Sequence, residues 1–396
     1  MSVVVTPKIL LPINSIEKEK WAVIACDQFT SEPEYWDKIK AYVDNVPSTY
    51  HLILPEAYLD DEIKHKIDKV NYNMDLYLRN NLFDEHEAMI LVERQTPHVK
   101  RRLGLVLAID LDEYEYQPGK KGRIAATEET VPERIPPRVK IRENAPIELP
   151  HVLVLIDDGS QNIIKNLYKN KNNFLKIYDF KLNMNGGYIK GFEIKNTKPI
   201  IEAIDSLPND LNLIVGDGNH SLASAKVCWE KIKVNLTDEA RKNHPAKYAL
   251  VELISLYDEG LTFEPIHRVL FNTDRSLIRV LESRLKGDGE LEIYFNSEIY
   301  KIAVPKNPFI AIKEIQTIID EYLERNKYVE IDFVHGIESL KKIVKTNEDC
   351  MGITMPALER DKLLPYIREN GVLPRKSFSL GEAEEKRYYL EGKKIL

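Results

Sequence analysis

Short apolar segments alternate with amphipathic ones along most of the chain. Leu103–Leu111, Val152–Ile156 and Leu211–Val215 are apolar runs whose length favours buried strands. Leu222–Lys233 and Ile310–Arg325 carry apolar residues three and four positions apart, which is the spacing of an amphipathic helix. This alternation predicts an α/β or mixed α+β protein with strands in both directions.

Turn sequences separate two pairs of predicted strands. Ile177–Met184 and Tyr188–Ile194 flank the sequence N-G-G, which predicts a hairpin. Tyr248–Leu256 and Leu261–Val269 flank D-E-G and are expected to pair in the same way. The polar stretch Thr127–Asn144 contains three prolines and is expected to be an irregular connection.

The length of 396 residues exceeds the size at which one hydrophobic core usually keeps growing, so two domains are expected. We place a main α/β domain over residues 1–270 and a smaller α/β domain over residues 271–396. The C-terminal tail of the smaller domain is expected to return toward the functional site.

Composition and charge narrow the class of protein. Hydrophobic residues make up 43% and charged residues 30%, which is typical of a packed globular protein. The net charge of −7 argues against a nucleic-acid partner, because phosphate backbones require a basic face. No apolar run approaches the ~20 residues that a membrane helix needs, so no membrane partner is expected. Three distant cysteines form neither a disulfide framework nor a zinc spacing, which favours the cytoplasm.

The most informative segment is the strand-to-helix junction that follows Leu211–Val215. Its glycines permit unusual backbone angles, and the helix start offers free N–H groups and a positive dipole end to an anion such as a nucleotide phosphate. Asp217 could hold Mg²⁺ or take a proton. The alternative is that Asn219 or Ser221 is only a helix cap. The junction reads Gly216-Asp217-Gly218-Asn219-His220-Ser221.

Residues 216–223, with the sequence G-D-G-N-H-S-L-A, resemble the central motif of the domain-of-unknown-function 1015 family, in which many members read D-G-H-H-R. The resemblance extends to A-C-D-Q-F-T-S at 25–31 and P-I-H-R at 265–268. It continues through residues 373–387 and so covers nearly the whole chain. It indicates a family and leaves the reaction open.

A more distant resemblance is to the ParB/sulfiredoxin group, whose nucleotide-binding members carry D-G-x-H-R at such a turn. Some members phosphorylate free serine with ATP or ADP. Residues 217–220 match that pattern, but Ser221 stands where arginine is usual and offers one hydrogen bond in place of a charged fork. The resemblance implies a nucleotide-binding core, ATP or ADP as donor, Mg²⁺, and a hydroxylated amino acid as acceptor.

Basic residues in the proline-containing stretch form a second candidate cluster. Arg138 and Arg142 would share a helical face, but Pro136 and Pro137 are expected to prevent a regular helix. In a loop these arginines could converge on a phosphate or carboxylate, or they could be solvated surface charges. Glu128 is a candidate metal ligand or base.

Further candidates lie near both ends of the chain. His267 and Arg268 follow Pro265 at a strand end, and Lys376 lies in a Pro-Arg-Lys-Ser stretch; both places suit a phosphate or carboxylate contact, although a lone histidine is more often structural. Cys26, after an apolar strand, could have a lowered thiol pKa or be a buried structural cysteine. Asp27 is expected to face substrate. The run Glu382–Arg387 is expected to be a solvated helix face.

Together these features predict transfer of a phosphoryl group from ATP or ADP to the hydroxyl of a small molecule, with free L-serine implied by the resemblance. Alternatives are a nucleotide hydrolase and a non-catalytic nucleotide or amino-acid sensor. The oligomeric state stays open, a homo-oligomer included. The predicted catalytic residues are Asp217, His220 and Glu128, of which Asp217 and Glu128 would hold Mg²⁺. The predicted nucleotide and substrate contacts are Gly216, Gly218, Asn219, Ser221, Arg138, Arg142, His267, Arg268 and Lys376.

Overall fold

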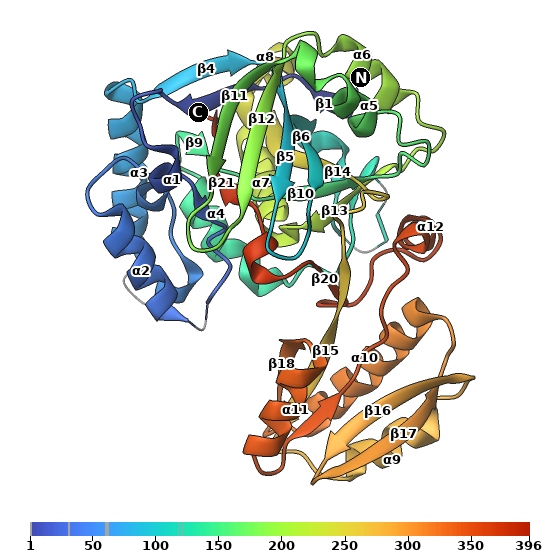
Figure 1. Cartoon of the computed structure of the whole chain (residues 1–396). Helices are drawn as coiled ribbons and strands as arrows, with labels where there is room; N and C mark the ends of the chain where they lie inside the picture. Colours follow the sequence, from blue (N-terminus) through green and yellow to red (C-terminus); the bar gives the residue numbers. More distant parts are fainter. Residues whose placement is uncertain (1, 31, 60–62, 118, 121) are drawn as a thin grey trace. The chain divides into compact units, whose positions relative to one another are not determined.

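The computed structural model describes residues 2–30, 32–59, 63–117, 119–120 and 122–396 (Figure 1). The chain divides into two compact units, one formed by Met1–Leu261 with Glu382–Leu396 and the other by Thr262–Gly381. The chain thus leaves the first unit once and re-enters it for its last residues. The predicted division into domains of 1–270 and 271–396 stays a prediction.

A ten-stranded mixed sheet forms the centre of the first unit. Its central strand β6 is buried along its whole length, as expected for a strand covered on both faces. Most neighbours are antiparallel, but β10 runs parallel to β14, and β8 runs parallel to β13 and β7. The strand order is β11 (Leu175–Lys181), β12 (Tyr188–Ile194), β5 (Met89–Gln95), β6 (Arg102–Asp110), β14 (Tyr248–Ser255), β10 (Leu153–Ile156), β13 (Leu213–Asp217), β8 (Ile124–Ala126) and β7 (Tyr114–Glu115), with β1 (Val4–Val5) paired to β6.

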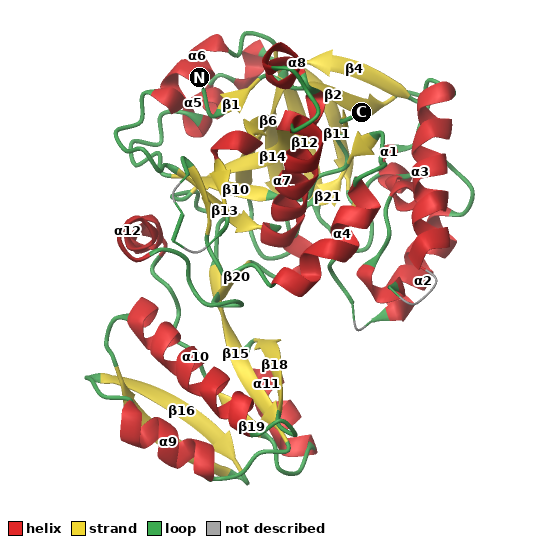
Figure 2. Cartoon of the chain, turned by 180° about the vertical axis from the view of Figure 1, so that it is seen from behind, coloured by secondary structure: helices red, strands yellow, loops and turns green. Residues whose placement is uncertain are grey.

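Helices cover both faces of this sheet. Trp229 of α7 packs in one apolar cluster with residues of α5 and α6, whereas Trp36 of α2 packs in the other with residues of α3 and with Tyr389. Figure 2 shows α4 beside α7. The helices of this unit are α1 (Lys18–Trp21), α2 (Pro33–Val43), α3 (Ile63–Arg79), α4 (Ile135–Arg142), α5 (Ile164–Lys169), α6 (Lys198–Asp205), α7 (Asn219–Lys233) and α8 (Asp238–Asn243).

Three small strand pairs bind the ends of the chain to the first unit. β2 (Lys8–Pro12) pairs with β4 (Phe83–Glu87). The C-terminal strand β21 (Tyr388–Tyr389) pairs with β3 (Val23–Ile24), and β22 (Lys393–Lys394) pairs with β9 (Ile147–Glu148). The last residues are therefore part of the first unit's hydrogen-bonded structure.

The second unit contains a six-stranded sheet and four helices among its described elements. β15 is central, because it pairs with three strands. The strand order is β17 (Glu298–Val304), β16 (Gly289–Phe295), β19 (Met351–Ile353), β15 (Phe263–Phe271) and β18 (Glu330–His335), with β20 (Phe378–Leu380) also on β15. The helices are α9 (Ser276–Arg284), α10 (Pro308–Arg325), α11 (Ile337–Thr346) and α12 (Arg360–Asn370).

The mixed α/β class is confirmed, and so is the hairpin of β11 and β12. The expected pairing of β14 with β15 is wrong, because β6 and β10 occupy both edges of β14 while β15 belongs to the second unit's sheet. The expected irregular connection contains the helix α4. Pro136 and Pro137 lie in its first turn, where the missing N–H groups have no intrahelical partner to lose.

Candidate functional site

The junction between β13 and α7 places a carboxylate beside the start of a helix. β13 ends at Asp217, Gly218 follows with φ +83°, and α7 begins at Asn219. A Cβ on residue 218 would lie 3.0 Å from Val152, so both the left-handed backbone and the close packing require glycine. The Asp217 carboxylate accepts the Gly218 N–H at 2.9 Å. This carboxylate is therefore fixed next to the first turn of α7, where N–H groups and the helix dipole favour an anion.

Polar contacts fasten the loop before α4 to the first turn of α7. The Thr127 hydroxyl donates to a backbone carbonyl of β13 at 2.6 Å, and Asn219 Nδ2 lies 3.4 Å from Thr127 Oγ1. The Val131 N–H donates to His220 Nε2 at 3.1 Å, so this ring nitrogen carries no proton. Asn219 and His220 thus lie together with the loop that carries Glu128.

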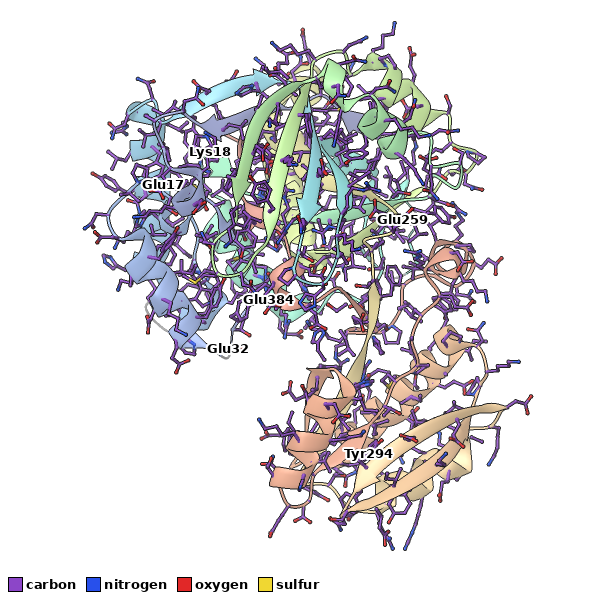
Figure 3. The ribbon with its side chains drawn as sticks, in the orientation of Figure 1. Glu17, Lys18, Glu32, Glu259, Tyr294 and Glu384 are labelled. Carbon is purple, nitrogen blue, oxygen red and sulfur yellow. The ribbon has the colours of Figure 1, made fainter. Side chains whose placement is uncertain are left out.

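A lysine from the far end of the sequence pairs with Asp217. Lys386 Nζ lies 3.0 Å from Asp217 Oδ2, and its side chain is 9% exposed. Arg94 fixes the lysine's backbone, because its guanidinium donates to the carbonyl oxygens of Glu384 at 2.8 Å and Lys386 at 2.5 Å. Glu384, whose carbonyl oxygen accepts from Arg94, is labelled in Figure 3. Glu382 is exposed, but the prediction of a solvated face over Glu382–Arg387 is wrong for the last three residues of that run, which are buried.

A chain of polar side chains lies at the same edge of the sheet. β10 begins where Leu153 pairs with Asp217, so His151 lies just before β10 at the edge where β13 ends. His151 Nε2 is 3.5 Å from Asp27 Oδ2, and its Nδ1 is 2.8 Å from the Tyr389 hydroxyl. The pairing of β3 with β21 holds the segments that carry Asp27 and Tyr389 side by side.

The buried histidine and Asp27 stabilise each other's charge. Burial alone would raise the pKa of Asp27, but His151 and Lys386 hold that pKa well below its ordinary value. Burial alone would lower the pKa of His151, but Asp27, Asp217 and Glu56 raise it above the ordinary value. The arrangement therefore favours the charged forms of both groups, a carboxylate beside an imidazolium.

The neighbouring thiol is inert. Burial, together with the charges of Asp27 and Glu56, raises the pKa of Cys26 to about 12, which favours the buried structural cysteine over a thiol of lowered pKa. The Cys26 Sγ lies 3.1 Å from the Tyr389 hydroxyl. Cys26 is a structural member of the cluster.

The two arginines of α4 contact different carboxylates. Arg138 pairs with Glu56, whose backbone N–H donates to Cys26 O at 2.8 Å, so Arg138 lies at the Asp27 cluster. Arg142 pairs with Glu148, which is 5% exposed. Both side chains lie on one face of α4. Arg142 anchors the helix to a buried carboxylate, and only Arg138 lies at the Asp27 cluster.

Ser221 lies in the first turn of α7 and Gly216 in β13, whereas three other predicted residues belong to the second unit. Arg268 is fully buried and donates to Gln316 Oε1 at 2.9 Å and to Lys376 O at 2.8 Å. His267 Nδ1 accepts the Met355 N–H at 3.0 Å, and burial lowers the pKa of this histidine. A role of His267, Arg268 or Lys376 toward phosphate stays a prediction.

The sequence profile of the family described as "Protein of unknown function (DUF1015)" matches residues 10–333. The chain belongs to the DUF1015 family. No curated protein matches this DUF1015 sequence.

Solved structures with some likeness to this DUF1015 chain include a mutant free serine kinase in complex with ADP, which is 9% identical at a TM-score of 0.43 over 74% of this chain and 93% of that chain. A conserved hypothetical protein from Pyrococcus furiosus is 12% identical at a TM-score of 0.40, over 70% and 90% of the two chains. SbnI from Staphylococcus aureus, truncated at its C-terminus, is 9% identical at a TM-score of 0.40, over 70% and 82%. No activity follows from likeness at this level.

Membrane-spanning helices and metal-holding clusters of side chains are two features that the described part of the DUF1015 chain lacks. Within the described ranges, no helix is both long and apolar enough to cross a membrane. The same residues contain no group of three or more His, Cys, Asp or Glu side chains arranged to hold a metal. Mg²⁺ bound with a nucleotide takes many of its ligands from phosphates and water, so it needs only one or two carboxylates from a protein.

We expect His151→Asn to flatten the pH dependence of stability above the ordinary histidine pKa of 6.5. The pKa of His151 is raised in the folded protein above its ordinary value of 6.5. Its contribution is therefore complete below that value and is lost as pH rises through the folded pKa. Urea unfolding of wild type and variant between pH 6 and about 8.5 measures the difference in slope.

His244→Asn is the matched control. Burial lowers the pKa of His244, so its contribution has the opposite sign and appears as pH rises. The assignment of a charged His151 fails if His151→Asn leaves the slope unchanged or shifts it in the direction of His244→Asn.

Proposed function

We propose that the chain is a nucleotide-dependent phosphotransferase that acts on the hydroxyl of a small molecule, with free L-serine as the first acceptor to test. The observation that carries the proposal is the fixed Asp217–Lys386 pair beside the start of α7, at the edge of the sheet that also holds Asp27 and His151. Phosphoryl transfer needs mainly positioning and charge neutralisation, and this edge offers groups for both.

The start of α7 is the proposed phosphate site. The N–H groups around Asn219 and Ser221 would face the phosphate, and Gly218 leaves room for close approach because it has no Cβ. Lys386 and Arg138 would neutralise charge on the transferred group. When bound, Mg²⁺ would further neutralise the phosphates; Asp217 and Glu128 are its proposed carboxylate ligands.

Two carboxylates are candidates for the acceptor's proton. Asp27 is ionised and held by His151, and its side chain is 24% exposed. Asp217 is exposed to the same extent and is held by Lys386. A cation orients the carboxylate beside it and also lowers the affinity of that carboxylate for a proton. The role of either carboxylate would therefore be to receive the proton as the hydroxyl oxygen loses negative charge to phosphorus. The hydroxyl proton would pass to one of them as the oxygen attacks the terminal phosphorus and the nucleotide leaves.

We expect ATP or ADP with Mg²⁺ to raise the melting temperature, and a mixture with L-serine to yield a phosphomonoester. A ligand that binds only the folded state stabilises it by about 2.7 kcal/mol at a hundredfold excess over its Kd. Thermal unfolding measures binding, and phosphorus NMR follows the fate of the phosphoryl group. L-Alanine, which lacks the hydroxyl, is the matched control.

Each alternative outcome identifies another function. Nucleotide consumption that gives only inorganic phosphate would replace the kinase with a hydrolase. Binding without consumption would indicate a sensor. The nucleotide hypothesis is wrong if neither ATP nor ADP at millimolar concentration shifts the transition.

A further inference from the structure

Two arginines lie side by side in the interior of the first unit. Arg94 of β5 and Arg102 of β6 are directly opposed across the two strands, and they are 2% and 3% exposed. Opposed residues on neighbouring strands project from the same face of the sheet, so the two guanidinium groups share one environment. Burial and the charge of Arg102 lower the pKa of Arg94 to about 10. Two like charges therefore lie together where water screens them little.

Several N–H donors of this arginine pair have no acceptor. Arg94 Nε, Arg102 Nε and Arg102 Nη2 are buried and without a hydrogen-bond partner in the described part of the chain. The other nitrogens of Arg94 donate to main-chain carbonyls, among them Gly186 O at 3.1 Å. A guanidinium has five N–H donors in a planar arrangement. Each buried donor without an acceptor lowers the stability of the folded protein, because it has lost its hydrogen bond to water.

The carboxylates near the arginine pair are bound by other donors. Glu252 pairs with Arg387. Glu385 accepts the Thr96 hydroxyl at 2.9 Å. Asp258 accepts backbone N–H groups, that of Gly260 at 2.8 Å and that of Leu103 at 3.3 Å. None of the ion pairs among described residues joins Arg94 or Arg102 to a carboxylate.

We propose that Arg94 and Arg102 form a binding site for a free tetrahedral oxyanion, inorganic phosphate or sulfate. Such an ion accepts several N–H bonds at once and neutralises both guanidinium groups, which a water molecule cannot do. The near-complete burial of both residues favours a small free ion over a phosphate ester.

The proposed ion would act on the candidate site through Arg94. The same guanidinium holds the carbonyl oxygens of Glu384 and Lys386, and Lys386 pairs with Asp217. An anion that fixes Arg94 would therefore also fix the segment that supplies Lys386. This site is distinct from the start of α7 and does not depend on the proposed phosphotransferase activity.

Thermal unfolding in phosphate, sulfate or chloride at equal ionic strength tests the proposal. Phosphate and sulfate are expected to raise the melting temperature of wild type above its value in chloride, and to do the same for the neighbouring control Arg101→Met, whose side chain is exposed. The shift should be lost in Arg102→Met. In chloride, Arg102→Met should melt at or above wild type, because it removes an unpaired buried charge.

Three results would overturn the proposal. One is an equal melting temperature of wild type in phosphate, sulfate and chloride. That result would mean that water molecules accept the hydrogen bonds of the unpaired arginine N–H groups. Another is a phosphate shift that persists in Arg102→Met. The third is a phosphate shift abolished by excess ADP, which would place the ion at the start of α7 instead. ATP or ADP should still raise the melting temperature of Arg102→Met. This result would show that the arginine pair can fail as an anion site while the proposed nucleotide site remains.

If Arg102→Met does not fold, Arg102→Lys takes its place. Lysine keeps the charge but loses the planar fork, so the affinity for phosphate measured by calorimetry should fall by about tenfold or more. Unchanged phosphate affinity in Arg102→Lys would then exclude the arginine pair as the binding site.

Discussion

Arg387→Met is expected to destabilise the first unit by about 3–5 kcal/mol, because it leaves two buried carboxylates without their cation. Arg387 pairs with Glu252 and with Glu391, and its Nε donates to Pro150 O at 3.2 Å. Glu391 also accepts the Tyr178 hydroxyl at 2.6 Å. All of these side chains are nearly or fully buried, so water cannot replace the lost contacts.

Urea unfolding followed by tryptophan fluorescence measures this loss, because all three tryptophans, Trp21, Trp36 and Trp229, belong to the first unit. Arg241→Met is the matched control. Arg241 pairs with Asp238 at the surface of the same unit, where an exposed ion pair contributes about 0–1 kcal/mol. Similar losses in the two variants would show that the buried network does not hold the C-terminal segment.

The core of the candidate site could be predicted from sequence because its signal is local. An apolar run is followed by two glycines and then by apolar residues at helical spacing. These local features predict the turn at Gly218 and the start of α7 without knowledge of distant contacts. The same local reasoning was insufficient for α4. Proline prevents a helix only in its interior, and Pro136 and Pro137 lie in the first turn.

The partners of Asp217 and Asp27 could not be predicted, because strand pairing over long sequence separations supplies them. Lys386 and Tyr389 reach the site because β21 pairs with β3, and single residues of these types carry no local signal. A run of acidic and basic residues such as Glu382–Arg387 is typical of a solvated helix. Lys386 and Arg387 are buried here because each meets a carboxylate from another segment.

The failed pairing of β14 with β15 has the same origin. A short turn between two apolar runs favours a hairpin only when the facing strand edges are free. Both edges of β14 are taken by strands from elsewhere in the sequence, so the chain continues into another sheet. Local patterns therefore predicted most elements, whereas neighbours in the sheet depended on the whole chain.

Asp217→Asn is expected to lower turnover by ~10²–10⁴ while the protein stays folded, with a loss of stability limited by the partial exposure of Asp217. The amide oxygen of asparagine can still accept the Gly218 N–H, so the turn persists. The substitution removes the negative charge that pairs with Lys386 and that would hold Mg²⁺ or accept the proton. Turnover by phosphorus NMR, measured beside urea unfolding, separates the chemical role from the structural one.

Asp27→Asn assayed in parallel distinguishes the two carboxylates. If Asp27 accepts the proton and Asp217 binds the metal, both variants lose turnover, but only Asp217→Asn should be partly restored by raising the Mg²⁺ concentration, since a weakened metal site fills by mass action. Wild-type turnover in Asp217→Asn would remove Asp217 from the mechanism and leave it as a turn residue. A loss confined to Asp27→Asn would assign proton transfer to the Asp27–His151 pair, which the fold holds at the same edge of the sheet.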